Sequence, residues 1–536
     1  MTKYSDQPPE NHTPTDQLFG HPRGLYICFA TEMWERFSFY GMKYLLLLYL
    51  TKYHLFTDAM GLDVLGSYAA LVYSTPVIGG LLADRYLGMR KAVIFGGCLL
   101  VLGHLGMAIE GHPAQYVNGE IIRDNRALQV FYFSIALIIV GVGFLKPNIS
   151  TIVGKLYSEN DSRRDSGFTI FYMGINIGAF VATLLCGYLG ETLGWHYGFG
   201  AAGIGMLIGL AIFLYGQQYL QGHAEPHDPA KLKESPFGDK VLLGHKVLPG
   251  LNREKLIYLG GLLSVMGIWQ LVQATHWVEW SLNGLSIIVA LGILWFILTR
   301  CNSIERGRMS VLMVLTFSTV VFWALFEQTA ASMTLYADRV VDREVLGFEV
   351  KASQFGALNP MFIMLLAPLF ALLWTGLAKH NREPATPTKF SLGIIQAGLG
   401  FGALVIGACF PNESGKVAAI WLLLAYLLHT TGELCLSPVG LSAVTKLSVP
   451  RIVGLMMGTW FLATAYSEFM AAQIAKLAAI EVPSADSTGN LQLIDTVTAL
   501  ASYTELFMTL FWVGCGAGIF LLCLSPYLTK HMHGIK

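Results

Sequence analysis

Apolar residues run along this chain in long blocks that are separated by short polar joints. A helix needs about 20 mainly apolar residues to cross the hydrocarbon core of a bilayer. Fourteen blocks of this length occur between Leu25 and Tyr527, so the pattern predicts an all-α integral membrane protein with fourteen transmembrane helices. The predicted spans are 25–53, 64–83, 92–111, 128–154, 167–190, 198–219, 256–276, 282–299, 311–336, 355–377, 391–410, 417–445, 453–478 and 503–529.

The overall composition agrees with this interpretation. Hydrophobic residue types make up 54% of the chain, charged residues only 13%, and the mean hydropathy is +0.54, which lies outside the range of ordinary soluble proteins. The formal net charge of zero carries no information about partners. We expect membrane lipids around the chain and no nucleic-acid partner.

Basic residues distinguish the two sides of the predicted membrane. Most Lys and Arg residues lie in alternate joints, for example Arg90, Arg163 and Arg306, whereas the intervening joints hold few. Basic joints favour the cytoplasmic side. An even number of spans then places both termini in the cytoplasm. We expect residues 1–24 to form a cytoplasmic N-terminal segment, because they lack the features of a removable secretory signal.

The longest polar interruption divides the chain near its middle. Residues 221–255 carry His, Pro, Lys and Asp, a composition typical of a linker, here cytoplasmic, between two bundles. The apolar stretches within 256–300 contain no ionisable residue, so we interpret these two spans as accessory helices that face lipid. The remaining spans form an N-terminal six-helix bundle, 25–220, and a C-terminal six-helix bundle, 301–536. Transporters built from repeated bundles share this arrangement.

Seven ionisable residues stand out inside the predicted spans. A charge at the middle of a bilayer costs about 2.5–3.5 kcal/mol on insertion scales, so each should face a partner or an aqueous cavity. The first span contains Glu32, Glu35, Arg36 and Lys43. Later spans contain Lys146, Glu327 and Glu433. Helical spacing places Glu32, Arg36 and Lys43 on one face together with Tyr40.

These charges admit two interpretations. Structural ion pairs would lock helices together, but buried pairs contribute little stability because desolvation offsets their attraction. In a transport site, a carboxylate that gains a proton releases its cation and frees a gate. Charges of both signs also suit a zwitterionic cargo, whereas a sugar would need neither. We therefore favour proton-coupled transport of a zwitterion.

Several motifs match a known family. The run 32–40, Glu-Met-Trp-Glu-Arg-Phe-Ser-Phe-Tyr, resembles the E-x-x-E-R-F-x-Y-Y motif of the proton-dependent oligopeptide transporter (POT/PTR) family. Residues 80–84 with Gly88 are similar to the first signature of that family, and residues 171–178 are similar to the second. Further matches are Lys146, Glu327, Asn359-Pro360, Glu433 with Ser437-Pro438, and Trp460-Phe461.

The resemblance implies a bacterial symporter of di- and tripeptides with protons. It implies a major facilitator fold, in which two accessory helices lie between two six-helix bundles. It also implies a multi-pass protein of the bacterial inner (plasma) membrane that works as a monomer and is not an enzyme. Protons are the coupling ion, and no other cofactor is expected.

The same resemblance implies a peptide site. Arg36 and Lys146 would bind the peptide carboxylate, and Glu433 with Asn359 would bind its amino terminus, an orientation that charge complementarity favours. The remaining peptide-binding residues would be Tyr40, Tyr73, Asn176, Trp323, Trp460 and Phe461.

Coupling and gating are assigned to the same buried charges. Protons would bind at Glu32, Glu35 and Glu327. Gating ion pairs are expected among Lys43, Glu327, Lys146 and Glu433, with Lys43 paired to Glu327. Phe39 stands where the family motif has the first Tyr of its terminal pair, which removes one hydroxyl group.

Other functions stay open at this point. The same fold could carry nitrate, another organic anion or a drug-like cargo, and a membrane sensor could bind peptides without moving them. A membrane enzyme is disfavoured, because the chain has neither an H-E-x-x-H nor a G-x-S-x-G motif. The eight cysteines are scattered without the spacing of metal ligands or disulfides, so no metal site is predicted.

Overall fold

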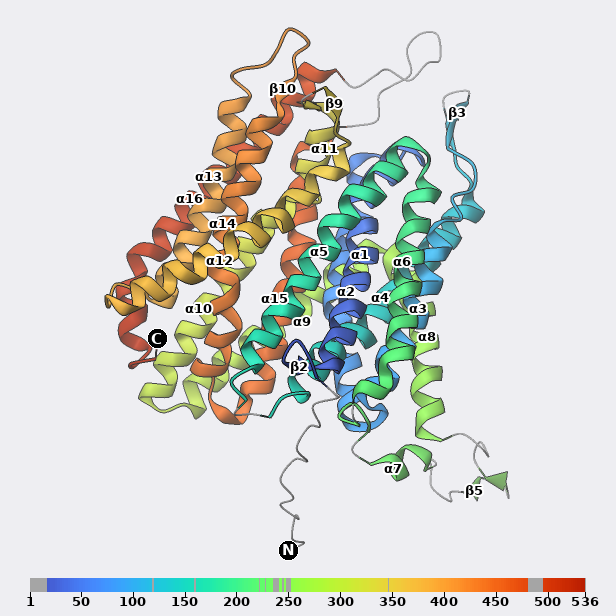
Figure 1. Cartoon of the computed structure of the whole chain (residues 1–536). Coiled ribbons are helices and arrows are strands. Elements are labelled where there is room, and N and C mark those ends of the chain that lie inside the picture. Colours follow the sequence, from blue (N-terminus) through green and yellow to red (C-terminus); the bar gives the residue numbers. More distant parts are fainter. Residues whose placement is uncertain are drawn as a thin grey trace, which may run out of the picture.

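The computed structural model describes residues 17–117, 120–158, 161–220, 222–226, 228–234, 241–242, 245–246, 252–345, 347–480 and 495–535. Long helices dominate, and they gather in two bundles that lie side by side (Figure 1). The predicted N-terminal segment and linker fall partly outside the described residues.

The first bundle contains six long helices. They are α1 (Arg23–Lys52), α2 (Asp58–Leu82), α3 (Met89–Met107), α4 (Asn125–Lys155), α5 (Arg164–Thr192) and α6 (Trp195–Gly216). α1 packs along α5 and α6, and α3 packs along α4 and α6. Leu45 and its three following leucines on α1 are fully buried, so α1 is an interior helix of this bundle.

The second bundle contains six membrane-length segments. They are α10 (Ser303–Phe326) continued by α11 (Ser332–Arg339), α12 (Leu358–Lys379), α13 (Thr386–Gly407), α14 (Ala419–Leu447), α15 (Val453–Ala475) and α16 (Thr496–His531). A 3-10 turn at Glu327–Thr329 separates α10 from α11, which places Glu327 at a break in the helix. α15 packs against α2 of the first bundle, and α12 packs against α5.

Two further helices stand outside both bundles, and the short α7 (Pro229–Lys233) precedes them. α8 (Arg253–Gln273) packs on α4, and α9 (Thr275–Arg300) contacts α2, α10 and α15 (Figure 1). Few of their residues are buried, and they expose large apolar side chains such as Leu263, Trp280 and Ile288. This exposure is what we expect of helices that face lipid.

The described strands are short and lie in the joints. The antiparallel pairs are β1 (Gln17–Leu18) with β2 (His21–Pro22), β3 (Gln115–Val117) with β4 (Glu120–Ile122), β5 (Val241–Leu242) with β6 (His245–Lys246), and β8 (Glu344–Val345) with β9 (Phe348–Glu349). β7 (Val341–Asp342) pairs in parallel with β10 (Val417–Ala418). We call the side that holds joints 53–57, 108–124 and 340–351 the upper face, as in Figure 1, and the opposite side the lower face.

The predicted number of spans agrees with the helices. In the described part of the chain, 12 segments are long and apolar enough to cross a membrane, with α10 and α11 counted as one. α1 and α15 also have membrane length, but buried charges such as Glu35 and Glu468 lower their hydropathy. The predicted all-α membrane fold is therefore confirmed, and the described chain contains fourteen helical segments of membrane length, 12 of which are also apolar enough to cross a membrane.

Two glycines allow α5 to lie directly on α1. A Cβ atom at Gly178 would lie 2.1 Å from the backbone oxygen of Met33, and one at Gly174 would lie 2.8 Å from the ring of Phe29. Asn176 lies two residues from each glycine, so helical geometry turns it away from this contact. The glycines therefore serve helix packing, and Asn176 is free to serve another purpose.

Substituting Gly178→Ala should destabilise the protein by about 1–3 kcal/mol, because the added methyl group has no room and the two helices must separate. The matched control is Gly284→Ala on α9, where nothing lies within 4 Å of the position of a Cβ atom. We expect the control to be neutral or slightly stabilising, since Ala is the better helix former. Thermal unfolding of the purified proteins in detergent measures both, and equal losses would contradict the packing argument.

Candidate functional site

α1 carries a buried charge cluster near the middle of its length. The Nε atom of Arg36 lies 3.0 Å from Oε1 of Glu32 and 2.5 Å from Oε2 of Glu35, and all three side chains are at most 5% exposed. The i, i+4 spacing of Glu32 and Arg36 produces the first contact. The Nη2 atom of Arg36 has no hydrogen-bond partner in the described chain. The guanidinium group therefore keeps a buried donor that can bind an anionic group.

A second charge cluster joins the two bundles. Nζ of Lys43 donates to Oε2 of Glu327 at 2.8 Å and to Oε1 of Glu468 at 3.3 Å. Glu327 lies in the break after α10, and Glu468 lies on α15, so Lys43 links α1 to two segments of the second bundle. The side chains are 4–11% exposed. The predicted pair of Lys43 with Glu327 is present.

Glu468 is not among the predicted site residues. It lies in the run 465–469, Ala-Tyr-Ser-Glu-Phe, which none of the family motifs covers. The signal that identifies it is the one that identified the others, namely an ionisable residue within a membrane-length apolar block. Glu468 forms an ion pair with Lys43, so this signal also identifies a member of the charge cluster at position 468.

Lys146 lies over an aromatic ring. Its Nζ atom is 4.3 Å from the ring centroid of Tyr73 on α2, in a cation–π arrangement. Pro147 follows directly within α4 and has no backbone donor of its own. Lys146 interacts electrostatically with Arg36 and Glu35. It forms no ion pair with a carboxylate in the described part of the chain, so its charge is available to a ligand.

Glu433 on α14 is held by a neutral partner. Nδ2 of Asn359 on α12 donates to Oε2 of Glu433 at 2.9 Å and to Oγ1 of Thr430 at 3.1 Å. The expectation that Lys146 and Glu433 take part in gating ion pairs is therefore not met in this conformation, within the residues described. The physical reason is that each side chain has another partner. Glu433 accepts a hydrogen bond from Asn359, and the ammonium of Lys146 lies over the ring of Tyr73.

The predicted pocket residues lie in different surroundings. The rings of Tyr40 and Tyr44 stack with centroids 6.4 Å apart on α1. Trp323 packs edge-on to Phe322 and Phe326 within the second bundle, at 5.3 and 5.2 Å.

Trp460, Phe461 and Asn176 complete that set. Trp460 is buried and edge-on to Phe390 at 6.5 Å, whereas its neighbour Phe461 is 39% exposed. Because adjacent helical residues point about 100° apart, these two aromatic rings serve different environments. Asn176 is buried, and its Nδ2 donates to the backbone oxygen of Tyr172 at 3.0 Å.

Phe39 lies beside both charge clusters. Its ring centroid is 5.4 Å from Cζ of Arg36 and 5.9 Å from Nζ of Lys43. The ring also stacks on Tyr68, whose hydroxyl has no hydrogen-bond partner among the described residues. The ring that replaces the motif Tyr can therefore stabilise two cations by cation–π contact without a hydroxyl group.

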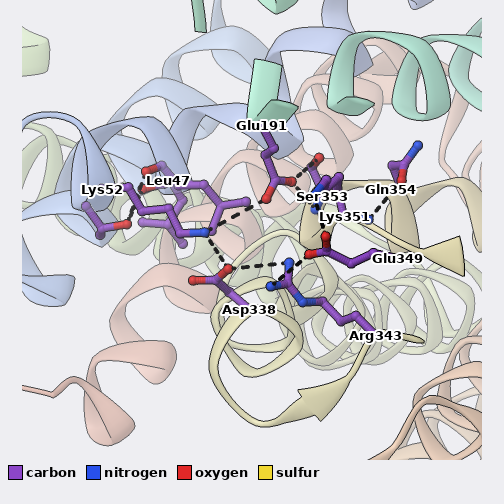
Figure 2. Close-up of polar contacts among 11 residues, drawn as sticks. Leu47, Lys52, Glu191, Asp338, Arg343, Glu349, Lys351, Ser353 and Gln354 are labelled. Atoms are coloured by element: carbon purple, nitrogen blue, oxygen red, sulfur yellow. Dashed lines mark hydrogen bonds and ion pairs between the residues drawn. The ribbon is translucent and has the colours of Figure 1, made fainter. Parts of the chain in front are cut away.

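A polar network joins the bundles on the upper face (Figure 2). Lys52 at the end of α1 lies 2.5 Å from Asp338 of α11 and 3.9 Å from Glu191 at the end of α5. Oε1 of Glu191 also accepts hydrogen bonds from the backbone N of Ser353 at 2.9 Å and from its hydroxyl at 2.6 Å. These contacts tie α1 and α5 to the segment that follows α11.

The network continues over side chains of the second bundle, of which Glu349 is exposed (Figure 2). Arg343 lies 3.8 Å from Asp338 and 3.7 Å from Glu349, and Lys351 lies 2.8 Å from Glu349. Lys351 holds the pKa of the Glu349 carboxyl below its ordinary value by a hydrogen bond to the charged form. Partly exposed pairs contribute at most about 1 kcal/mol each. These pairs join residues of the second bundle only, so they do not themselves link the two bundles.

A buried, bidentate ion pair also crosses the upper face. Nη1 and Nη2 of Arg339 each lie 2.6 Å from an oxygen of Asp58 at the start of α2. Nη1 also donates to the hydroxyl of Tyr503 at 3.0 Å, and the backbone N of Ile480 donates to Asp58 at 2.9 Å. A bidentate pair with its remaining hydrogen bonds made is the geometry that holds buried charge best.

Ion pairs between the bundles are distributed unevenly. A further pair joins Asp63 of α2 to Lys476, just after α15. In the described chain, every ion pair between α1–α6 and α10–α16 lies in the upper half of the molecule, including those of Lys43. The upper face is therefore closed in this structure.

Known proteins share this arrangement. The model of the POT family matches residues 90–492, which is most of the chain. The chain is 37% identical over 470 residues to the peptide transporter YePEPT of Yersinia enterocolitica, and this match covers 85% of the chain and 88% of that protein. The chain belongs to the POT family. A di-/tripeptide transporter of Lactococcus lactis is 35% identical to this POT protein over 503 residues, which cover 89% and 94% of the two chains.

A crystal structure of a relative gives the same fold. The peptide transporter POT in complex with sulfate superposes with a TM-score of 0.77 at 34% sequence identity, covering 97% of this chain and 98% of that chain. The predicted family and the predicted major facilitator fold are therefore confirmed for this POT protein.

Substituting Asp58→Ala should destabilise the closed form by about 3–5 kcal/mol, because it leaves the Arg339 guanidinium buried without an anion. The matched control is Lys52→Ala, which breaks a half-exposed pair on the same face and should cost about 1 kcal/mol or less. Thermal unfolding of the purified variants in detergent measures the difference. A loss of the same size for Lys52→Ala would show that burial does not set the strength of this closure.

Proposed function

We propose that this POT protein is a proton-coupled symporter that imports di- and tripeptides by alternating access. The observation that carries the proposal is the distribution of buried charge. In the described chain, Arg36 keeps an unbonded donor, Lys146 has no carboxylate partner, and Glu433 is held by an amide. A short peptide has one anionic and one cationic end, so it complements this set. Two relatives are named as peptide transporters.

The peptide carboxylate binds Arg36 and Lys146. The unbonded Nη2 of Arg36 and the ammonium of Lys146 provide charge-assisted donors from α1 and α4. The peptide amino group binds Glu433 and replaces part of the role of Asn359, whose amide stays as a second polar contact. Both ends of the cargo are then fixed, while its side chains are not.

The cargo side chains lie against partly apolar walls. Such walls accept many side chains, because apolar contact is not directional, and a few polar anchors fix the orientation. The residues that we assign to these walls and to the peptide backbone are Tyr40, Tyr73, Asn176, Trp323, Trp460 and Phe461.

Protons act on the two charge clusters. A proton on Glu32 or Glu35 weakens the hold of that carboxyl on Arg36 and frees the guanidinium for the peptide. The pair of Glu327 with Lys43 crosses the interface between the bundles, so a proton that binds to Glu327 or leaves it changes the charge balance of that contact. Proton binding thereby changes both the affinity for peptide and the contact that keeps the upper face closed.

Alternating access follows from movement of one bundle, residues 25–220, against the other, residues 301–536. The linker 221–255 and the accessory helices 256–300 allow this movement. The lower face and both termini are cytoplasmic, and the protein works as a monomer in the bacterial inner membrane. The closed upper face is then the arrangement of a carrier that has delivered or is releasing cargo to the cytoplasm.

Cargo other than peptide is less well matched. A simple anion such as nitrate would satisfy Arg36 and Lys146 but would leave Glu433 without a cation. A sensor that binds peptide without transport would not need ion pairs that cross the interface between two bundles. A site that needs both a cationic and an anionic group on its cargo therefore favours transport of a zwitterion.

Reconstituted protein in sealed liposomes should accumulate labelled dialanine under an inward proton gradient, and a protonophore should abolish the accumulation. The double variant Glu32→Gln with Glu35→Gln should lose uphill accumulation but keep counterflow, because exchange needs no net proton movement. Accumulation by the double variant at the wild-type level would exclude these carboxyls as the coupling site. Absence of all uptake by correctly folded wild-type protein would point to another cargo.

Substituting Arg36→Lys should weaken peptide binding at least about tenfold, since Lys keeps the charge but loses the planar, bidentate donor geometry. The matched control is Arg382→Lys, at an exposed position on the lower face, which should bind peptide as the wild type does. Competition of unlabelled dialanine in counterflow gives both affinities. Unchanged affinity for Arg36→Lys would argue against a carboxylate contact at this residue.

A further inference from the structure

The cluster around Lys43 contains more carboxyl groups than cations. Nζ of Lys43 lies 2.8 Å from Glu327 and 3.3 Å from Glu468, and no second cation lies within ion-pair distance of either carboxyl in the described chain. The two distances keep the carboxyl oxygens within about 6 Å of each other. Fully ionised, the cluster would carry a net charge of −1.

The surroundings of the cluster provide little solvation for that charge. Its cavity has a volume of about 10 Å³, which is about the space of one water molecule, and alanines such as Ala331 and Ala471 line much of it. From α2, Tyr68 and Tyr73 interact electrostatically with Glu468. From α4, Lys146 interacts with Glu468 electrostatically but beyond ion-pair distance.

Two carboxylates that share one buried site repel each other, and one of them takes up a proton when a single cation cannot neutralise both. Such a proton belongs to the pair and not to one residue. One ammonium, one carboxylate and one carboxylic acid are together neutral. The residues of this cluster are therefore those of a site that binds one proton while the upper face is closed.

We propose that Glu468 is a second proton-binding carboxyl of the Lys43 cluster and that it shares one proton with Glu327 while the upper face is closed. The proposal rests on the proposed proton-coupled transport and adds a residue to it. The proton comes from water on the upper side when that side is open, and it returns to water on the lower side. No other atom is exchanged.

The position of Glu468 couples this proton to the interface between the bundles. α15 lies directly on α2, where a Cβ atom at Gly66 would be 2.7 Å from the Cβ atom of Ala472. Phe469, next to Glu468, packs with Ala70 of α2 and Val278 of α9. Loss of the shared proton leaves two repelling carboxylates beside this tight contact, which favours separation of the helices and opening of the upper face.

The test compares Glu468→Gln with wild type in liposomes at an inward gradient of one pH unit, with the membrane potential held at zero. One coupled proton then changes the limiting accumulation of dialanine about tenfold, since one pH unit corresponds to a factor of ten. We expect Glu468→Gln to accumulate about tenfold less and to keep counterflow, because Lys43 and Glu327 alone are neutral without a proton. Glu327→Gln should show the same loss, and Glu468→Asp should retain most of the accumulation.

The matched control is Glu505→Gln on α16, where the side chain is exposed and forms no ion pair in the described chain. It should accumulate dialanine as the wild type does. Wild-type accumulation by Glu468→Gln would overturn the inference, and so would a loss confined to Glu327→Gln. These outcomes leave the proposed peptide transport itself intact.

An infrared measurement tests the shared proton without any transport. Wild-type protein should show the carbonyl stretch of a protonated carboxyl, and part of this band should disappear in Glu468→Gln but not in Glu505→Gln. An unchanged band in Glu468→Gln overturns the inference, even where that variant has lost both accumulation and counterflow. If wild type transports no peptide in any mode, the proposed function fails, and this band alone decides the role of Glu468.

Discussion

A charged side chain inside a membrane protein must face a polar partner or an aqueous cavity, because lipid does not solvate it. Much of this structure follows from that constraint. α1 brings Arg36 and Lys43 into the interior, and each cation meets two carboxyls there. The carboxyls around Arg36 come from α1 itself. Those around Lys43 come from the other bundle, so neutralising Lys43 requires that the bundles meet.

The contacts between the bundles differ in burial. The bidentate pair of Asp58 with Arg339 is buried and has further partners in Tyr503 and Ile480, whereas Lys52 in the other network of the upper face is half-exposed. Buried pairs are costly to desolvate, and therefore their net contribution is small compared with the effect of removing one partner. Such contacts close the upper face and can still be exchanged for water when the bundles separate.

Residues that share a local pattern were predictable. The spacing of Glu32, Arg36 and Lys43 on one helix places them on one face, and the structure has them there. Contacts between residues that meet only across the interface between the bundles were not predictable from the sequence. Asp58 and Arg339 lie in separate helices about 280 positions apart, and Glu468 lies outside every motif, so nothing local in the chain reports their partners.

The sequence by itself determined the membrane setting, the fourteen helices, the family and most of the buried charges, since apolar length and intramembrane charge are properties of single segments. Only the tertiary structure decided which charge faces which. In it, Glu468 pairs with Lys43, Asn359 donates a hydrogen bond to Glu433, and Lys146 lies over the ring of Tyr73. The reason is physical: an ion pair depends on distances of a few ångströms between helices, and helix packing, not sequence order, sets those distances.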